Sequence, residues 1–408
     1  MIKKSIFFLI LFISAGAIVN VKVFELPFYP LVVFMIVAGI AISSKIRIPQ
    51  SGTYLTFLLL IVFFALFIGR NEPLTSAADD LKVMAKYIIV WILCIYCSSN
   101  FKTKKDFYAQ FVYFFEKLLI FSFFTFVLSN VLNAALVNFG PVTAIGDQYQ
   151  TFFGLCFTTT NDFKKYNFHR NQSFFWEPGV FGMVILTMYV IKSIYLQEKK
   201  RVWVYYVAVL TTVSMGTILI FIGFNLFKNL LSKGKYVFNA RMVIFTILIA
   251  APIIFVINFV NTYSDLIEGA VGSVFHRNLN QDKSLDTRTD DLVYGFKASL
   301  DDLYAGHGQD YTDFYALTSA EASTNKAAYG GGITNGIIGL FYNYGVCYLI
   351  LFLGLLFKSA KDLANVPKYT LLIFFTFIGI LMVEPIQNSL LIFLILTFYN
   401  DKRLLKFS

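Results

Sequence analysis

One junction in this sequence decides the fold: His169-Arg-Asn-Gln-Ser-Phe-Phe-Trp-Glu-Pro-Gly-Val-Phe-Gly182. A polar stretch ends at Glu177, and an apolar run begins at Pro178. Proline costs little in the first turn of a helix, because its missing N–H would have no partner there. The junction therefore predicts an apolar helix that starts at Glu177-Pro178 and follows directly on a loop.

Composition extends this prediction to the whole chain. The 408 residues are 57% hydrophobic, 18% aromatic and only 14% charged. Apolar runs recur at the length of about 15 to 25 residues that crosses a bilayer core of about 30 Å. We expect an all-α polytopic integral membrane protein, one domain over residues 1–408, with about 12 transmembrane helices. The expected spans lie near residues 5–20, 28–43, 53–69, 83–98, 112–130, 175–195, 202–213, 216–231, 242–260, 335–357, 369–383 and 388–400.

The net charge of +10 has an explanation in membrane topology that does not require nucleic acid. Basic residues mark the cytoplasmic connections of membrane proteins, and here they cluster in alternate connections. This pattern predicts that both termini are cytoplasmic and that two long loops, residues 131–173 and 261–332, are external. The basic clusters are Lys3 and Lys4; Lys45 and Arg47; Lys102, Lys104 and Lys105; Lys199, Lys200 and Arg201; Lys233, Lys235 and Arg241; Lys358, Lys361 and Lys368; and Lys402, Arg403 and Lys406.

Two of these clusters flank residues 202–232, so the chain must cross the membrane an even number of times between them. We expect a tight hairpin that is broken near Ser214-Met-Gly216. One long tilted helix is the alternative, and it would invert the topology of everything that follows.

The cysteines indicate neither a metal site nor a disulfide framework. Cys94 and Cys97 have the spacing of a redox motif, but they lie inside an apolar run, where small buried side chains are the better interpretation. Cys156 is alone in the first long loop, and Cys347 lies in an expected span.

Long loops on a helical scaffold usually carry function. The second loop holds eleven acidic and five basic side chains, so an anionic group must be held by individual cations. Arginine offers a planar fork of donors that matches phosphate oxygens and stays charged whatever its burial. We therefore expect arginines to bind a lipid-linked diphosphate at the bilayer surface. Arg170 is the first candidate, and the second loop adds Arg277, Arg288 and Lys326.

Two local patterns surround these cations. Glu177 either caps the helix that follows it or has a catalytic role, and the two roles are compatible. The stretch Thr289–Leu300 is amphipathic, with Leu292, Val293, Phe296 and Leu300 at helical spacing. This spacing predicts a helix in the second loop that lies with its apolar side on the core below.

The motifs together resemble the bacterial O-antigen polymerase and O-antigen ligase superfamily. The resemblance rests on the spacing of Arg170, Glu177, Pro178 and Gly182, and on a Ser-x-Gly break at Ser214. It also rests on a long loop with an arginine at Arg288, on Gly306-His-Gly308, and on the return to the membrane from Thr334-Asn335 to Tyr344-Gly345. The arrangement of spans and loops is similar over nearly the whole chain, while each motif alone has little specificity for the family.

The resemblance implies a polysaccharide polymerase for O-antigen, capsule or exopolysaccharide. Such an enzyme joins undecaprenyl-diphosphate-linked oligosaccharide repeat units at the outer face of the bacterial plasma membrane. It implies a glycan donor and acceptor on lipid diphosphates, membrane lipid and a chain-length regulator protein as partners, and no cofactor. The similar ligases transfer finished glycan to lipid A core. They commonly carry a histidine before the re-entry asparagine, where this chain has Thr334. This departure favours the polymerase.

The expected mechanism gives each residue a role. Arg170 and Arg288 neutralise charge on the two diphosphates, and Glu177 is the general base for the acceptor hydroxyl. His307 and Asp310 are alternative bases. Further substrate contacts are expected from Arg277, His307, Lys326 and Asn335. No metal is required.

A flippase or ion-coupled transporter is the alternative from a different class. Function would then depend on ionisable and polar groups near the membrane. The candidates are Lys86, Glu116, Glu384 and Asn388, although snorkelling or helix capping at span ends also explains them.

Overall fold

A computed structural model describes most of the helical chain. It covers residues 2–15, 47–69, 77–131, 136–142, 148–152, 156–159, 169–175, 177–232, 292–308, 311, 314–315, 333, 335–384, 386–387, 389–397 and 404–406. The helices are α1 (Ile2–Ser14), α4 (Gln50–Gly69), α5 (Ala77–Asn100), α6 (Lys104–Val131), α8 (Pro178–Val190) with the π-helix η2 (Ile191–Tyr195), α9 (Val202–Thr212), α10 (Met215–Ser232), α15 (Gly336–Leu363), the short 3-10 helix η4 (Pro367–Tyr369), α16 (Thr370–Val383) and α17 (Leu390–Thr397).

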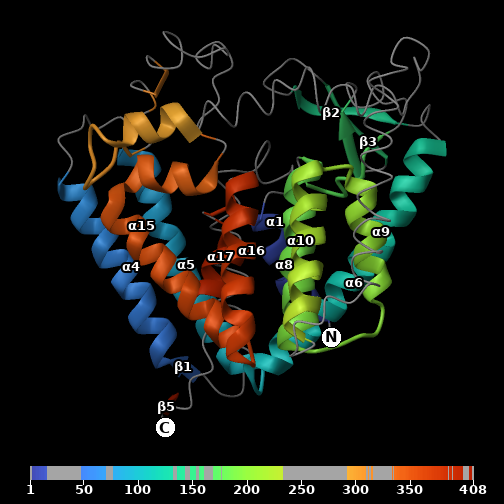
Figure 1. Cartoon of the computed structure of the whole chain (residues 1–408), viewed down its shortest axis with the longest axis horizontal. Coiled ribbons are helices and arrows are strands. Elements are labelled where there is room, and N and C mark those ends of the chain that lie inside the picture. The colour runs from blue at the N-terminus through green and yellow to red at the C-terminus, as the bar shows by residue number, and fades with distance from the viewer. Residues whose placement is uncertain are drawn as a thin grey trace.

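The helices stand side by side as a bundle (Figure 1). In the figure α4, α5 and α15 lie at one end, α6 and α9 lie at the other, and α8, α10, α16 and α17 lie between them. We call the side where α8 and α15 begin the loop face. The opposite side, where both chain termini lie, is the terminal face.

Ten of the twelve expected spans are helical, and the other two, residues 28–43 and 242–260, lie outside the described residues. Four helical segments are long and apolar enough to cross a bilayer: Lys104–Val131, Pro178–Tyr195, Met215–Ser232 and Gly336–Leu363. Shorter apolar helices accompany them. The described part is therefore a mostly helical membrane protein.

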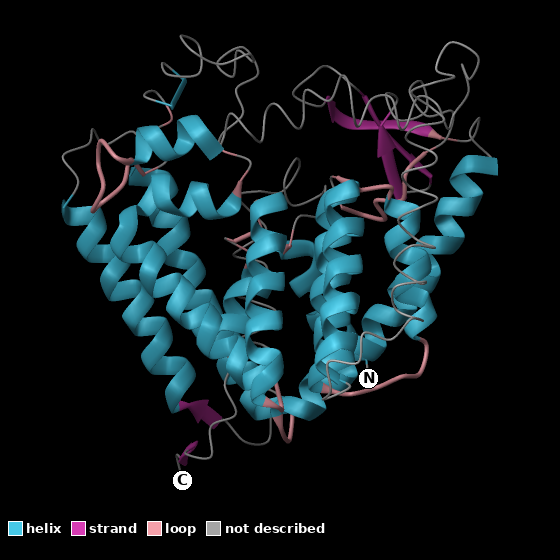
Figure 2. Ribbon diagram, viewed as in Figure 1, coloured by secondary structure: helices cyan, strands magenta, loops and turns pink. Residues whose placement is uncertain are grey.

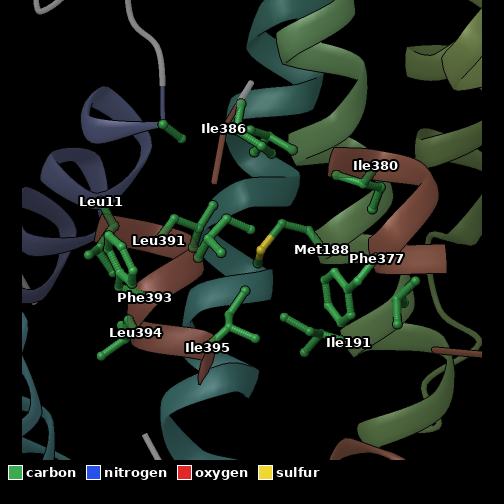
Figure 3. Close-up of a cluster of buried hydrophobic side chains, with 14 of the residues drawn as sticks. Leu11, Met188, Ile191, Phe377, Ile380, Ile386, Leu391, Phe393, Leu394 and Ile395 are labelled. Atoms are coloured by element: carbon green, nitrogen blue, oxygen red, sulfur yellow. The ribbon is translucent and has the colours of Figure 1, made fainter. Parts of the chain in front are cut away.

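Helix α8 is the centre of the bundle, and all of its 13 residues are buried. A helix that is hydrophobic on every side belongs in a protein core or in a bilayer, and α8 is enclosed by other parts of the chain. Figure 3 shows Met188 and Ile191 packed with Phe377 and Ile380 of α16 and with side chains of α17. Glycine permits the closest approach, because a Cβ atom at Gly182 would overlap the side chain of Thr217 on α10.

Helices α9 and α10 form the expected hairpin. Helix α9 ends at Thr212, Val213 has a positive φ of 49°, and α10 begins at Met215. The arms are antiparallel, since Tyr206 near the middle of α9 contacts both Phe221 and Asn225 of α10. The break within a residue of Ser214 confirms the hairpin, and the single long helix is excluded.

Strands depart from the all-α expectation. In the first long loop β2 (Val137–Val142), β3 (Gln148–Phe152) and β4 (Cys156–Thr159) form an antiparallel sheet on the loop face (Figure 2). Threonine and aromatic residues suit a pleated surface, which explains the strands at Gln148–Phe152 and Cys156–Thr159. On the terminal face β1 (Arg47–Pro49) pairs with β5 (Leu404–Lys406).

The helix of the second loop forms over residues 292–299, as expected, but its orientation was predicted wrongly. Leu292, Val293, Phe296 and Leu300 are exposed, and the buried side carries Gly295, Ala298 and Ser299. Small residues fit the narrow space above α15, where Gly295 approaches Ile338. Packing space has therefore overridden the apolar pattern.

Candidate functional site

The segment before α8 is held by hydrogen bonds to three elements of the loop face. Asn130 of α6 accepts a hydrogen bond from the His169 backbone N–H at 2.7 Å. The Asn171 amide donates to Thr211 Oγ1 of α9 at 3.0 Å, and the Phe157 N–H of β4 donates to Ser173 O at 2.8 Å. A polar segment in an apolar bundle needs such partners, and they fix the path of residues 169–175.

Glu177 occupies the N-cap position of α8, and Pro178 follows at the first helical position, as the sequence predicts. Glu177 therefore stands at the N-cap position as expected, but its side chain makes no capping hydrogen bond. Phe175 stacks on Phe181 with ring centroids 5.3 Å apart, which fixes the angle at which the chain enters the helix. The carboxylate of Glu177 is therefore not committed to capping.

Arg170 and Gln172 lie on the same anchored segment. Arg170 is half-buried and Gln172 is 1% exposed. Neither Oε1 nor Nε2 of Gln172 has a hydrogen-bond partner among the described residues. A buried amide normally has a hydrogen-bond partner, so water, a residue beyond the described ones or a bound molecule can complete the hydrogen bonds of Gln172.

The turn after α16 joins the start of α8 to the start of α15. Glu384 is 3% exposed, and its carboxylate lies so close to Gly179 that a Cβ atom there would overlap Oε1. Gln387 is 6% exposed, and its Oε1 lies 2.5 Å from the position of a Cβ on Gly336. Segments more than 150 residues apart in sequence thus form one polar region on the loop face.

Sequence reasoning missed Glu384 and Gln387 as members of this region, since it considered Glu384 only for a transporter. The signal was present: Glu384-Pro385 ends an apolar run with the same dipeptide that begins one at Glu177-Pro178. Snorkelling does not apply to Glu384, because its carboxylate is buried.

Asn335 caps α15, and it is 3% exposed. Its Oδ1 accepts hydrogen bonds from the N–H groups of Ile337 and Ile338, both at 3.1 Å. These bonds satisfy two donors that no helix can satisfy internally at its first turn. Only the Nδ2 group of Asn335 remains as a donor for a substrate.

Replacing Asn335 by alanine should therefore destabilise the protein by about 1 kcal/mol. Asn335→Asp keeps the capping acceptor and removes the amide donor, so it should preserve most of the stability. Denaturant unfolding of the purified proteins measures both. Equal destabilisation by the two changes would show that the cap is not the main contribution of Asn335.

His307 lies on a strap, residues 303–308, that crosses a kink in α15. Gly345 has φ 72° and ψ 178°, which interrupts the helix. The N–H groups of His307 and Gly308 donate to Tyr342 O at 2.8 Å and Asn343 O at 3.0 Å. The structure thus joins Gly306-His-Gly308 to Tyr344-Gly345, two motifs that are far apart in sequence.

The His307 ring is buried against aromatic side chains. It stacks on Tyr342 at 4.6 Å, and Tyr311 stacks on Tyr342 at 5.6 Å. His307 Nε2 lies 2.9 Å from Ala298 O, and since a carbonyl only accepts, Nε2 carries the proton. Any base role of His307 would belong to Nδ1. Burial raises the pKa of the nearby Tyr315 hydroxyl above its ordinary value, so this group stays neutral.

Several candidates cannot be placed. These are Arg277, Arg288, Asp310, Lys326, Thr334 and Asn388, which lie outside the described residues. The structure places Arg170 and Glu177 at the start of α8, and Asn335 and His307 against the first half of α15. Within the described ranges, three or more His, Cys, Asp or Glu side chains are nowhere grouped to hold a metal ion. Cys94 and Cys97 are fully buried, as expected.

Glu116 belongs to an ion cluster near the terminal face. Lys192 Nζ, on the π-helix, lies 2.5 Å from Glu116 Oε1 and 3.3 Å from Glu198 Oε2. Both Lys192 and Glu116 are buried, so neither snorkels to water. The cluster ties α6, η2 and the start of α9 together.

The architecture defines the class: a helical membrane protein with polar side chains where α8 and α15 begin. No family model matches the chain, and no curated protein matches its sequence.

Proposed function

We propose that this protein is a bacterial polysaccharide polymerase that joins lipid-diphosphate-linked oligosaccharide repeat units. The main support is the polar region at the loop-face ends of α8 and α15. The chain that leads into α8 carries Arg170, Gln172 and Glu177. Glu384 packs against Gly179 in the first turn of α8, and Gln387 packs against Gly336 at the start of α15. A substrate with an apolar lipid chain and a charged diphosphate would match both the apolar helices and the charged side chains at their loop-face ends.

The proposal includes the topology. About twelve spans cross the plasma membrane, the loop face is external and both termini are cytoplasmic. Most of the described basic residues support this orientation, because they lie toward the terminal face, whereas Arg170 and Lys297 are on the loop face. Lys104 pairs with Asp362, and Lys368 Nζ donates to Leu231 O at 2.7 Å. An excess of lysine and arginine marks the cytoplasmic side.

The reaction transfers the growing glycan. The bond between its anomeric carbon and the diphosphate oxygen breaks, and a bond forms to a hydroxyl oxygen of the acceptor repeat unit. Glu177 takes the hydroxyl proton, and the carrier lipid diphosphate leaves with its electron pair. Arg170 and Arg288 stabilise the charge on the diphosphates. Glu384 packs against Gly179 in the first turn of α8.

Deleting the gene and complementing it in its own host tests the proposal. In the null strain, single repeat units should be attached to the cell surface in place of long chains. The wild-type gene should restore the ladder of long polysaccharide chains on a gel. Arg170→Ala, Arg288→Ala and Glu177→Gln should each lower polymerisation about 100-fold or more at matched membrane abundance. Lys105→Ala removes an exposed cation on the terminal face and should leave the ladder intact.

Other outcomes identify other functions. Loss of all surface-attached glycan, with long chains accumulating on the carrier lipid, would indicate a ligase. Unchanged polysaccharide in the null strain would refute the proposal and favour a transporter.

A further inference from the structure

Helix 292–299 and the turn that follows it expose a stripe of apolar side chains. The stripe consists of Leu292, Val293, Phe296, Leu300 and Tyr304, which are 43%, 40%, 48%, 50% and 70% exposed. At 3.6 residues per turn, the four members from Leu292 to Leu300 fall within about a third of the helix circumference. Apolar side chains gathered in this way usually mark a surface that something else covers.

The opposite side of the same helix is fixed to the protein. Ala298 and Ser299 are fully buried, and a Cβ atom at Gly295 would lie 2.7 Å from the side chain of Ile338 on α15. His307 Nε2 donates to Ala298 O at 2.9 Å, and the N–H groups of His307 and Gly308 donate to carbonyls of α15. The helix cannot roll its apolar stripe inward without losing these contacts.

The stripe ends where the backbone of Tyr304 meets the kink of α15, a candidate membrane-spanning helix. Leu303 O accepts a hydrogen bond from the Val346 N–H at 2.8 Å, directly after the kink at Gly345. From that point α15 runs toward the terminal face with Ile350 65% and Phe357 41% exposed. On a candidate span such side chains face lipid. Tyr304 therefore stands at the upper end of a lipid-facing surface.

The orientation and the charges of the helix agree with a bilayer interface. Figures 1 and 2 show it at the loop face, lying across the direction of the long helices. Its charged neighbours Lys297 and Asp301 are exposed, and they lie beside the stripe rather than within it. A helix with one apolar and one charged side lies in the plane of the interface, with its apolar side among the acyl chains.

We propose that helix 292–299 is an interfacial helix whose apolar stripe is covered by bilayer lipid of the leaflet on the loop face. This anchor holds the strap of His307 and the start of α15 at the depth of the lipid headgroups. It requires only that α15 spans a membrane, so it stands apart from the proposed polymerase activity.

Depth-dependent fluorescence quenching tests the proposal on the full chain. An environment-sensitive fluorescent amino acid is placed at Phe296, Leu300 or Lys297 in separate preparations. Each is reconstituted into vesicles of phosphatidylcholine and phosphatidylglycerol, with or without lipid that carries a nitroxide near the top of its acyl chain. Iodide in the buffer reports exposure to water. Two stripe positions guard against a local disturbance at either one.

The expected result is several-fold stronger nitroxide quenching at Phe296 and Leu300 than at Lys297, with iodide quenching in the reverse order. Iodide quenching at the stripe as strong as at Lys297 would place the helix in water. Protection of the stripe from both quenchers would mean that protein covers it. Either outcome overturns the proposal, and neither bears on polymerisation.

Discussion

Replacing Lys192 by methionine should lower the free energy of unfolding by about 3 to 5 kcal/mol. The change leaves Glu116 buried without the cation 2.5 Å from its carboxylate, and Arg201 Nη1 at 3.9 Å from Oε2 is a weaker substitute. An unpaired charge in an apolar interior is far more costly than no charge at all. Denaturant unfolding in detergent measures the loss.

The double variant Glu116→Gln, Lys192→Met separates the ion pair's contribution to stability from any contribution of Glu116 to activity. It removes both charges, so most of the stability should return. Lys199→Met removes an exposed cation from the neighbouring connection and should be nearly neutral. A double variant that is folded but inactive would show that Glu116 has a role beyond pairing, as the transporter alternative requires.

Replacing Gly345 by alanine should displace the strap that carries His307. The φ and ψ of Gly345, 72° and 178°, lie in a region that is essentially restricted to glycine, where another residue costs about 1 to 3 kcal/mol. A Cβ atom would also overlap Tyr304 O, and moving the strap would break its backbone hydrogen bonds, worth about 1 kcal/mol each. We expect a total loss of several kcal/mol and loss of polymerisation.

The same helix offers a matched control for this experiment. A Cβ atom at Gly354 would meet no atom within 4 Å, so Gly354→Ala should leave unfolding and the polysaccharide ladder unchanged. Gly306→Ala should repeat the effect of Gly345→Ala, because its Cβ would lie 2.5 Å from Gly345 N. If Gly345→Ala unfolds like the wild type, the close crossing is not required.

Local pattern was sufficient for the described helices of this fold. The apolar runs predict the helices, Pro178 marks the start of α8, and the stretch around Ser214 marks the hairpin. These features depend on residues within a few positions of one another, so they can be recognised without a tertiary structure. The strands of the first loop were missed, because short strands without strict alternation give little signal.

The candidate site was predicted only in part. Arg170, Glu177 and Asn335 were chosen from sequence, and the structure places them at the starts of α8 and α15. Glu384 packs against the start of α8 and Gln387 against the start of α15. The dipeptide Glu384-Pro385 marks a helix boundary in the sequence, but it does not show which helices meet there. Arg288 remains a prediction from its motif alone.

The sequence by itself determined that the chain is a helical membrane protein and approximately where its described helices lie, because apolar length and proline or glycine signals are local. Only the tertiary structure decided which side of helix 292–299 faces outward, which cation pairs with Glu116, and why residues 306 and 345 must both be glycine. Each of these depends on a contact with a segment distant in the chain, and close packing between such segments, rather than local preference, decides it.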